Sequence, residues 1–409
     1  MINIDSKVVK VYSVLIALLP IISIYSSGIP GVNLGEILLI AFLAYSVLLN
    51  RRVVFNPKHF NSIILFGWFI VMTTLIAMFF DSSQIADVFV RTVRFTFYLL
   101  IIYYLSKKYF SIDYTSKIIK NVSILATIYI LIQNISYNYF GIILKGFLPF
   151  IPVYTSHYET YDYASIYNML FYRPTSFFLE PAHYSQYALI GLVVLLYKEK
   201  FNMKNIISSI FLTTGILIST SGQGLILAAF LWVLYAVYIL FSNTLSKQKR
   251  LFGMIFPILL LVILPFILQS DVVQNNISRI LASGTGTAFA ARAEGYFAFG
   301  LKDNIFTLFF GAGFGNTPEG IWYSSLAYLL YCTGIIGLVF FVGILLMFYI
   351  NAKNLYTKML IILCFGLSAS AEIIHSFWVV LILSLICYSN HNVKIKVRDN
   401  NSIQLNVSR

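Results

Sequence analysis

Long apolar blocks alternate with short polar segments along almost the whole chain. Lipid offers no hydrogen-bond partner to a bare backbone, so blocks long enough to cross ~30 Å of hydrocarbon are expected to be helical. The blocks predict transmembrane helices over residues 9–27, 34–49, 61–80, 88–105, 121–140, 182–197, 205–219, 223–241, 251–268, 323–349, 358–371 and 373–389. The pattern therefore predicts an all-α integral membrane protein with about 12 transmembrane helices.

The distribution of basic residues orients these helices, because Lys and Arg concentrate in cytoplasmic segments. With both termini placed in the cytoplasm, 21 of the 28 basic residues fall in predicted cytoplasmic segments. The remaining seven are Arg91, Arg94, Lys145, Arg173, Arg279, Arg292 and Lys302. A miscounted helix would scramble this bias from that point onward, so the bias favours an even number of transmembrane helices. The sequence shows no internal repeat, low-complexity linker or soluble domain, so we expect one polytopic domain over residues 1–409. Two long outer loops follow, over about 141–181 and about 269–322, and loops of such length are commonly functional.

Composition agrees with this interpretation and excludes other classes. Hydrophobic residues make up 59% of the chain and charged residues only 11%, whereas soluble domains carry about 25% charged residues. The net charge of +13 follows topology and forms no single patch, so we expect no nucleic-acid partner. All three cysteines lie in apolar blocks and no two of the five histidines stand at a ligand spacing, so we expect no metal and no cofactor.

Arginine is unevenly distributed between the two sides. The predicted cytoplasmic segments hold 16 Lys and 5 Arg, whereas the outer segments hold 2 Lys and 5 Arg. The planar guanidinium binds phosphate or carboxylate through two parallel hydrogen bonds, which Lys cannot do. The bias favours an outer binding site for an anion such as phosphate or pyrophosphate; chance and pairing with acids are the alternative.

The first outer loop ends in the segment Arg173-Pro-Thr-Ser-Phe-Phe-Leu-Glu180-Pro-Ala-His183. Its two prolines favour an extended approach to a helix start. Arg173, Glu180 and His183 are therefore expected at the membrane surface, near a helix N-terminus that favours anions.

Tyrosines are frequent just upstream in the same loop, among them Tyr161, Tyr167 and Tyr172. Tyrosine is typical of the aromatic belt at a membrane interface, and it is equally suited to stacking against sugar rings. Both interpretations stay open.

The second outer loop offers Arg279 and Arg292, followed by the glycine-rich segment Gly311-Ala-Gly313-Phe-Gly315-Asn316. Glycines at this spacing allow backbone N–H groups to approach an anion closely, which makes Gly313 a candidate binding residue. A turn leading into the next helix explains the same glycines without a ligand.

Two further pairs of ionisable residues lie near the outer ends of predicted helices. Arg91 and Arg94 are three residues apart and share a helix face, with Asp87 placed to pair with Arg91. Both arginines are candidate substrate-binding residues, although simple extension toward lipid headgroups is the alternative. Glu372 and His375 are expected to share a helix face in the last span, where ionisable groups are costly and commonly functional. A structural hydrogen bond is the alternative for this pair.

Taken together, these motifs resemble those of the O-antigen polymerase (Wzy) family and, more distantly, the related O-antigen ligases. The resemblance rests on the segment Arg173–Pro181, on Arg292 followed by the glycines up to Gly315, on Gly334-Ile-Ile-Gly337, and on the two enlarged outer loops. Many family members carry Asn or His just after the second loop, whereas this chain reads Gly-Ile-Trp-Tyr-Ser over residues 320–324.

The resemblance implies a glycosyltransferase-C-like enzyme of the bacterial inner membrane. It would transfer an undecaprenyl-pyrophosphate-linked glycan onto the next lipid-linked repeat unit on the periplasmic face, without a metal. In this mechanism Arg173, Arg279 and Arg292 would stabilise the leaving pyrophosphate, and the acceptor hydroxyl would be positioned or deprotonated by Glu180 first, by His183 second and by His375 third. Candidate partners are the lipid-linked oligosaccharides, the bilayer, a chain-length regulator and a flippase. An O-antigen ligase is the alternative within the class, and a lipid-linked oligosaccharide flippase or other transporter is the alternative from another class.

The charge bias makes a topology prediction. Reporter fusions at Lys200 and Lys249 should report the cytoplasm, and fusions at Tyr161 and Asp303 should report the outer side. Alkaline phosphatase activity, which needs the oxidising outer compartment, measures this. High activity at Lys249 would contradict the twelve-helix topology.

Overall fold

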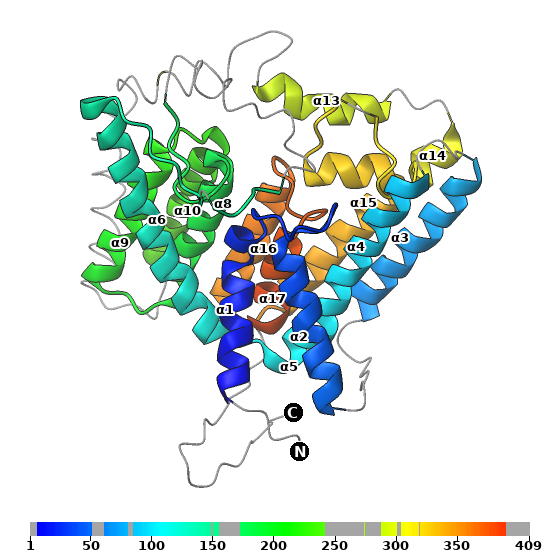
Figure 1. Ribbon diagram of the computed structural model, residues 1–409, viewed down its shortest axis with the longest axis horizontal. Helices are drawn as coiled ribbons and strands as arrows, with labels where there is room; N and C mark the ends of the chain where they lie inside the picture. The colour runs from blue at the N-terminus through cyan, green and yellow to red at the C-terminus, as the bar shows by residue number, and fades with distance from the viewer. Residues whose placement is uncertain are drawn as a thin grey trace. The chain divides into compact units, whose positions relative to one another are not determined.

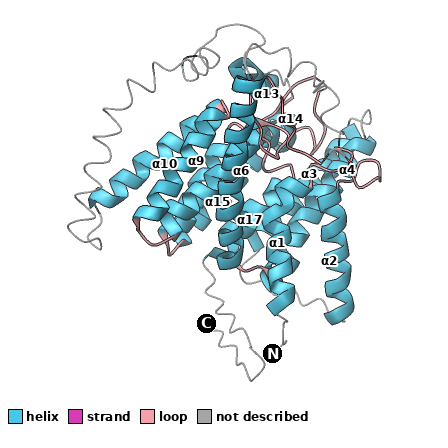
Figure 2. Ribbon diagram, turned by 60° about the vertical axis from the view of Figure 1, so that its left-hand side comes forward, coloured by secondary structure: helices cyan, strands magenta, loops and turns pink. Residues whose placement is uncertain are grey.

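The computed structural model describes residues 6–50, 61–80, 85–148, 150–154, 172–241, 274, 288–300, 304–318 and 320–389. Within these residues the chain consists of helices and loops (Figure 2), with no strand beyond an isolated bridge between Tyr25 and Val153. The fold class predicted from the apolar blocks, all-α, is confirmed.

The chain forms two compact units. The first comprises Met1–Ser23, Ser27–Ile118 and Arg292–Arg409, and the second comprises Ile24–Ser26 and Ile119–Ala291. Two helices therefore cross a unit boundary, namely α6 (Ile112–Phe140) and α13 (Ala288–Gly300).

The first unit combines both ends of the chain. Besides the first turns of α6, its helices are α1 (Ser6–Ile22), α2 (Leu34–Asn50), α3 (Asn61–Phe80), α4 (Ile85–Leu100), α5 (Lys107–Tyr109), most of α13, α14 (Ile305–Phe310), α15 (Ser325–Asn351), α16 (Leu355–Ser368) and α17 (Trp378–Ser389). A π-helical segment, Ile101–Ser106, continues α4. Helix α1 packs against α17, so the two ends of the described chain lie side by side (Figure 1).

The second unit contains most of α6 together with α8 (Pro181–Val193), its π-helical continuation Val194–Lys198, α9 (Met203–Ile218) and α10 (Gly222–Phe241). Helices α8, α9 and α10 pack against one another and appear as one green group in Figure 1.

Each range predicted to span the membrane overlaps a helix, except 251–268, which lies outside the described residues. Within the part of the chain that the structure describes, four helices are long and apolar enough to cross a membrane: α3, α6, α10 and α15. Shorter apolar helices include α2, α9, α16 and α17.

Hydroxyl groups link the helices inside the first unit. The Ser106 hydroxyl lies 2.8 Å from the hydroxyls of both Tyr12 and Ser384, which joins α1, the π-helical segment and α17. The Tyr388 hydroxyl donates to the carbonyl oxygen of Ile102 at 2.9 Å. Such contacts satisfy polar groups where no water is at hand.

Glycines allow the helices of the second unit to approach closely. A Cβ added at Gly191 of α8 would lie 2.5 Å from the Ser123 hydroxyl, and one added at Gly224 of α10 would lie 2.5 Å from Cβ of Ser185. Both distances are shorter than real carbon contacts, so these positions accept only glycine without a shift of the neighbouring helix.

Helix α15 is interrupted at Gly334, whose φ of 67° and ψ of −172° are not helical. The break leaves carbonyl groups of the preceding turn without helical hydrogen-bond donors. Backbone amides of the glycine-rich loop donate to these carbonyl groups instead. The amides of Ala312 and Gly313 donate to the carbonyls of Tyr331 (3.1 Å) and Cys332 (3.0 Å). The sequence motif Gly334–Gly337 was expected inside one continuous helix; the structure shows a break at its first glycine.

This break makes a stability prediction. Gly334→Ala should destabilise the protein by about 1–3 kcal/mol from backbone strain alone, because only glycine readily adopts this conformation. An added Cβ would also collide with the backbone of Phe309. Thermal unfolding of the detergent-purified protein should show a lower midpoint.

Gly343→Ala is the matched control in the same helix. Nothing lies within 4 Å of a Cβ added there, and Gly343 has no positive φ. Its midpoint should equal or slightly exceed that of the wild type. Equal midpoints for the two variants would contradict a strained break at Gly334.

Candidate functional site

Three of the four predicted catalytic residues lie on one segment of the second unit. Arg173 is partly buried, and its Nε donates to the hydroxyl of Thr220 at 3.0 Å. Thr220 belongs to the turn between α9 and α10 and has a φ of +55°, which is rare for a β-branched residue. The arginine side chain is therefore oriented by a turn 47 residues further along the chain.

The segment carrying Arg173 is attached firmly to α6. The amide of buried Ser176 donates to Oε1 of Gln133 at 2.8 Å, and its hydroxyl donates to the carbonyl of Ala126 at 2.9 Å. Nε2 of Gln133 donates in turn to the carbonyls of Leu144 (2.9 Å) and Ser176 (3.3 Å). The segment before α8, which turns at Ser176 with a φ of +57°, is thus held to α6 by one buried amide side chain.

Glu180 and His183 stand where α8 begins. Glu180 is the N-cap residue, with extended backbone, and its side chain makes no capping hydrogen bond. Pro181 occupies the first helical position, where its missing N–H costs nothing. The Glu180 carboxylate interacts electrostatically with the His183 imidazole. A carboxylate that does not cap the helix, an imidazole and a helix N-terminus therefore lie close together, a combination suited to positioning a hydroxyl and an anion.

Polar side chains also line the contact between α8 and α10. The hydroxyls of Ser185 and Ser221 lie 2.8 Å apart. Gln186 of α8 and Gln223 of α10 are also almost fully buried. Thr220, Gln186 and Gln223 are not among the candidate residues predicted from the sequence. Polar residues inside apolar blocks were the signal that could have identified them.

The structure describes only some of the remaining candidate residues of the two outer loops. Tyr172 stacks on Tyr137 of α6, with ring centroids 4.5 Å apart. Tyr161, Tyr167 and Arg279 lie outside the described residues. Arg292 lies in α13, one turn before Gly295, and its side chain is outside what the structure describes.

In the first unit, Arg91 lies against the glycine-rich loop. Its Nη1 donates to the carbonyl of Gly315 at 3.1 Å and to the hydroxyl of Thr317 at 3.2 Å. The expected ion pair with Asp87 is wrong: Asp87 is exposed and makes no salt bridge with Arg91. Gly315 approaches the Arg91 side chain so closely that a Cβ would lie 3.0 Å from it, and this contact directs the guanidinium toward the loop.

The amides of the glycine-rich loop are largely engaged within the protein. Gly313 donates to Cys332, as described above, and Phe314 donates to the Thr74 hydroxyl at 2.9 Å. The amide of Asn316 donates to the carbonyl of Gly313 at 3.1 Å. This geometry favours the turn interpretation of these glycines over an anion cradle at Gly313.

Glu372 and His375 do not share a helix face, contrary to the sequence prediction. Both lie in a non-helical segment before α17, which begins at Trp378. The Ser325 hydroxyl accepts the amides of Ile373 (2.7 Å) and Ile374 (2.9 Å), which replaces helical hydrogen bonding there.

His375 still contacts two other candidate groups. Its ring stacks on Tyr328 with centroids 4.0 Å apart, and its Nε2 lies 3.9 Å from Oε2 of Glu372. Tyr328 also interacts with Arg91. The structure therefore brings Arg91, the glycine-rich loop and His375 together around one buried tyrosine.

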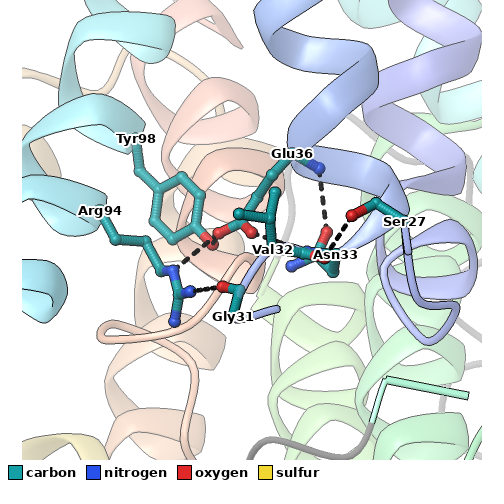
Figure 3. A network of polar contacts seen from close by, with 7 residues as sticks. All are labelled: Ser27, Gly31, Val32, Asn33, Glu36, Arg94 and Tyr98. Carbon is teal, nitrogen blue, oxygen red and sulfur yellow. Dashed lines mark hydrogen bonds and ion pairs between the residues drawn. The ribbon is translucent and has the colours of Figure 1, made fainter. Parts of the chain in front are cut away.

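Arg94 pairs with Glu36 (Figure 3). Its Nε lies 2.9 Å from Oε1 of Glu36, and its Nη2 donates to the carbonyl of Gly31. The same carboxylate accepts the Tyr98 hydroxyl at 2.6 Å. Glu36 also exchanges hydrogen bonds of 2.9 Å with Asn33, the capping box that starts α2. Glu36 was missed in the sequence analysis, although the Asn-x-x-Glu spacing of a capping box was readable.

Among the residues that the structure describes, no group of three His, Cys, Asp or Glu side chains could hold a metal ion. No family model and no curated protein matches the chain. The fold and the site define a class: an all-α, multi-pass membrane protein.

The Glu36 network makes a stability prediction. Glu36→Ala should destabilise the protein by about 3 kcal/mol, because it removes the ion pair, the tyrosine contact and the helix cap together. Chemical denaturation in detergent measures this. Asp87→Ala removes an exposed carboxylate and should leave stability unchanged; equal losses in both variants would refute a structural role specific to Glu36.

Proposed function

We propose that this chain is a polymerase of a surface polysaccharide, and specifically of O-antigen. The single observation that carries the proposal is that Arg173, Glu180 and His183 lie on one short segment that leads into α8, with Arg173 oriented by Thr220 and Glu180 interacting with His183. A guanidinium, a carboxylate and an imidazole on one such segment suit a reaction between a hydroxyl and a pyrophosphate-bearing donor.

The proposed reaction is transfer of a glycan from undecaprenyl pyrophosphate to the next lipid-linked repeat unit. The acceptor hydroxyl oxygen bonds to the anomeric carbon of the donor, and the bond from that carbon to the pyrophosphate oxygen breaks. The electron pair leaves with the pyrophosphate, and the hydroxyl proton passes to Glu180, with His183 as the second choice. Arg173 stabilises the charge that develops on the leaving group.

The proposed topology also gives the side of the membrane on which the reaction takes place. With twelve transmembrane helices and cytoplasmic termini, the start of α8 faces the periplasm of the bacterial inner membrane. The charge bias along the sequence supports this orientation. A glycosyltransferase-C-like arrangement is part of the same proposal and rests on the motif resemblance.

Deletion of the gene distinguishes the proposal from its alternatives. Loss of a polymerase leaves lipopolysaccharide core capped with a single repeat unit, whereas loss of a ligase or a flippase leaves bare core. Gel electrophoresis of the surface polysaccharide separates these outcomes. Bare core in the deletion strain would contradict the polymerase proposal.

Complementation of that strain tests Arg173. Arg173→Lys keeps the charge but loses the bidentate geometry, so chain extension should fall about 30- to 1000-fold, which corresponds to about 2–4 kcal/mol. The rate is measured with purified protein and the lipid-linked repeat unit.

Lys145→Ala is the control, because it removes an exposed positive charge from the same outer loop. It should extend chains at the wild-type rate. Normal extension by Arg173→Lys would exclude a pyrophosphate-binding role for this arginine, even if the deletion strain identified a polymerase.

A further inference from the structure

Among the described residues, two that are not glycine have a positive φ, and both are linked to Arg173. Thr220 has a φ of +55° and Ser176 a φ of +57°. Thr220 accepts the hydrogen bond from Nε of Arg173, and Ser176 follows Arg173 by three residues on the same segment. Such conformations cost stability in residues with a side chain, and they are concentrated at functional sites.

Thr220 occupies the position at which glycine usually ends a helix. Helix α9 ends at Ile218, Ser219 is its C-cap, and the amide of Thr220 donates to the carbonyl of Leu217 at 3.0 Å. Glycine is the usual residue just after a C-cap, because without a Cβ it adopts the left-handed conformation freely. A β-branched threonine is among the least suited residues there. The turn itself therefore does not explain this side chain.

The contact made by the hydroxyl of Thr220 does explain it. Nε of the partly buried Arg173 donates to Oγ1 of Thr220 at 3.0 Å. A guanidinium binds two oxygens in parallel either through Nε and one Nη or through both Nη atoms. Since Nε is engaged by Thr220, a bidentate contact of this arginine uses the edge formed by Nη1 and Nη2. The hydroxyl thus sets both the direction and the binding edge of the guanidinium.

The backbone that carries Arg173 is fixed by separate contacts. The amide of Ser176 donates to Gln133 and its hydroxyl to a backbone carbonyl of α6, which holds the turn at Ser176 against that helix. Gly146 packs on the same turn, and a Cβ added there would lie 1.5 Å from the Ser176 carbonyl oxygen. Arg173 is therefore held through its backbone near Ser176 and through its side chain at Thr220. Stabilisation of a transition state requires groups that are preorganised in this way.

We propose that Thr220 is a positioning residue, whose hydroxyl orients Arg173 so that the Nη1–Nη2 edge meets the pyrophosphate of the lipid-linked donor. The turn gives up stability for this contact. The inference rests on the proposed function and deepens it, since it assigns a residue that acts through Arg173 rather than on the substrate.

Three substitutions at Thr220 separate the hydroxyl from the backbone conformation. Thr220→Val keeps the shape and loses the hydroxyl, Thr220→Gly loses the hydroxyl and relieves the strain, and Thr220→Ser keeps the hydroxyl. Chain extension is measured with purified protein and the lipid-linked repeat unit. Thr220→Val and Thr220→Gly should each lower kcat about tenfold and leave KM within about twofold of the wild type, because the arginine acts on charge that develops in the transition state. Thr220→Ser should keep the wild-type kcat.

Thermal unfolding of the same proteins separates positioning from a structural role. Thr220→Gly should have a higher midpoint than Thr220→Val, because neither has the hydroxyl and only glycine fits the conformation. Thr214→Val is the matched control, since it makes the same substitution at an exposed residue of α9 whose hydroxyl bonds to Ile210 of the same helix. It should leave kcat unchanged. If kcat follows the midpoint, so that Thr220→Gly extends chains faster than Thr220→Val, Thr220 is structural and the inference is wrong.

Combination with Arg173→Lys tests whether Thr220 acts through the arginine. A lysine cannot present the two-nitrogen edge that Thr220 orients, so Thr220→Val should cause no further loss of kcat in the Arg173→Lys protein. A tenfold loss in both backgrounds would show that Thr220 acts independently of Arg173, and it would overturn the inference.

The remaining outcomes separate the inference from the proposed function. Wild-type kcat in Thr220→Val or Thr220→Gly overturns the inference and leaves the proposed function intact, and so does a loss in Thr220→Ser as large as that in Thr220→Val. If the wild type extends no chains from the repeat unit, the proposed function and the inference fail together.

Discussion

The structure depends on close approach between helices whose polar groups must be satisfied without water. In the second unit this approach is made at glycines, where Gly191 faces Ser123 and Gly224 faces Ser185. Hydroxyl groups then complete the contacts, as between Ser185 and Ser221. Small residues and short polar side chains are the usual means of helix association in lipid, because burial of apolar surface drives little there.

The same constraint shapes the break in α15. The carbonyl groups that lose their helical donors at Gly334 accept hydrogen bonds from amides of the glycine-rich loop. The loop and the helix are therefore joined by backbone hydrogen bonds. Arg91 then closes the loop through the carbonyl of Gly315. The glycines that were candidate anion-binding residues along the sequence are therefore used for contact between backbone segments.

The outer arginines illustrate how one residue type serves different ends. Along the sequence they form a single class, marked by their rarity on that side. In the structure Arg94 pairs with Glu36, Arg91 binds a loop, and Arg173 is oriented by Thr220. Arg94 makes a charged pair inside the protein that stabilises α2 against α4, whereas Arg173 lies on the segment that carries Glu180 and leads into α8. Only the latter arrangement carries a functional proposal.

The sequence by itself determined that the chain is helical and approximately where the helices lie. Predicted ranges such as 61–80 and 223–241 agree closely with Asn61–Phe80 and Gly222–Phe241, because an apolar layer leaves the backbone no alternative to a helix. It also placed Glu180 at a helix start, through the proline that follows. Tertiary structure alone decided that Glu36 meets Arg94, that α15 breaks at Gly334 and that Thr220 orients Arg173. These outcomes depend on partners that are distant in the sequence. A local sequence pattern cannot predict which distant polar groups the folded chain brings together.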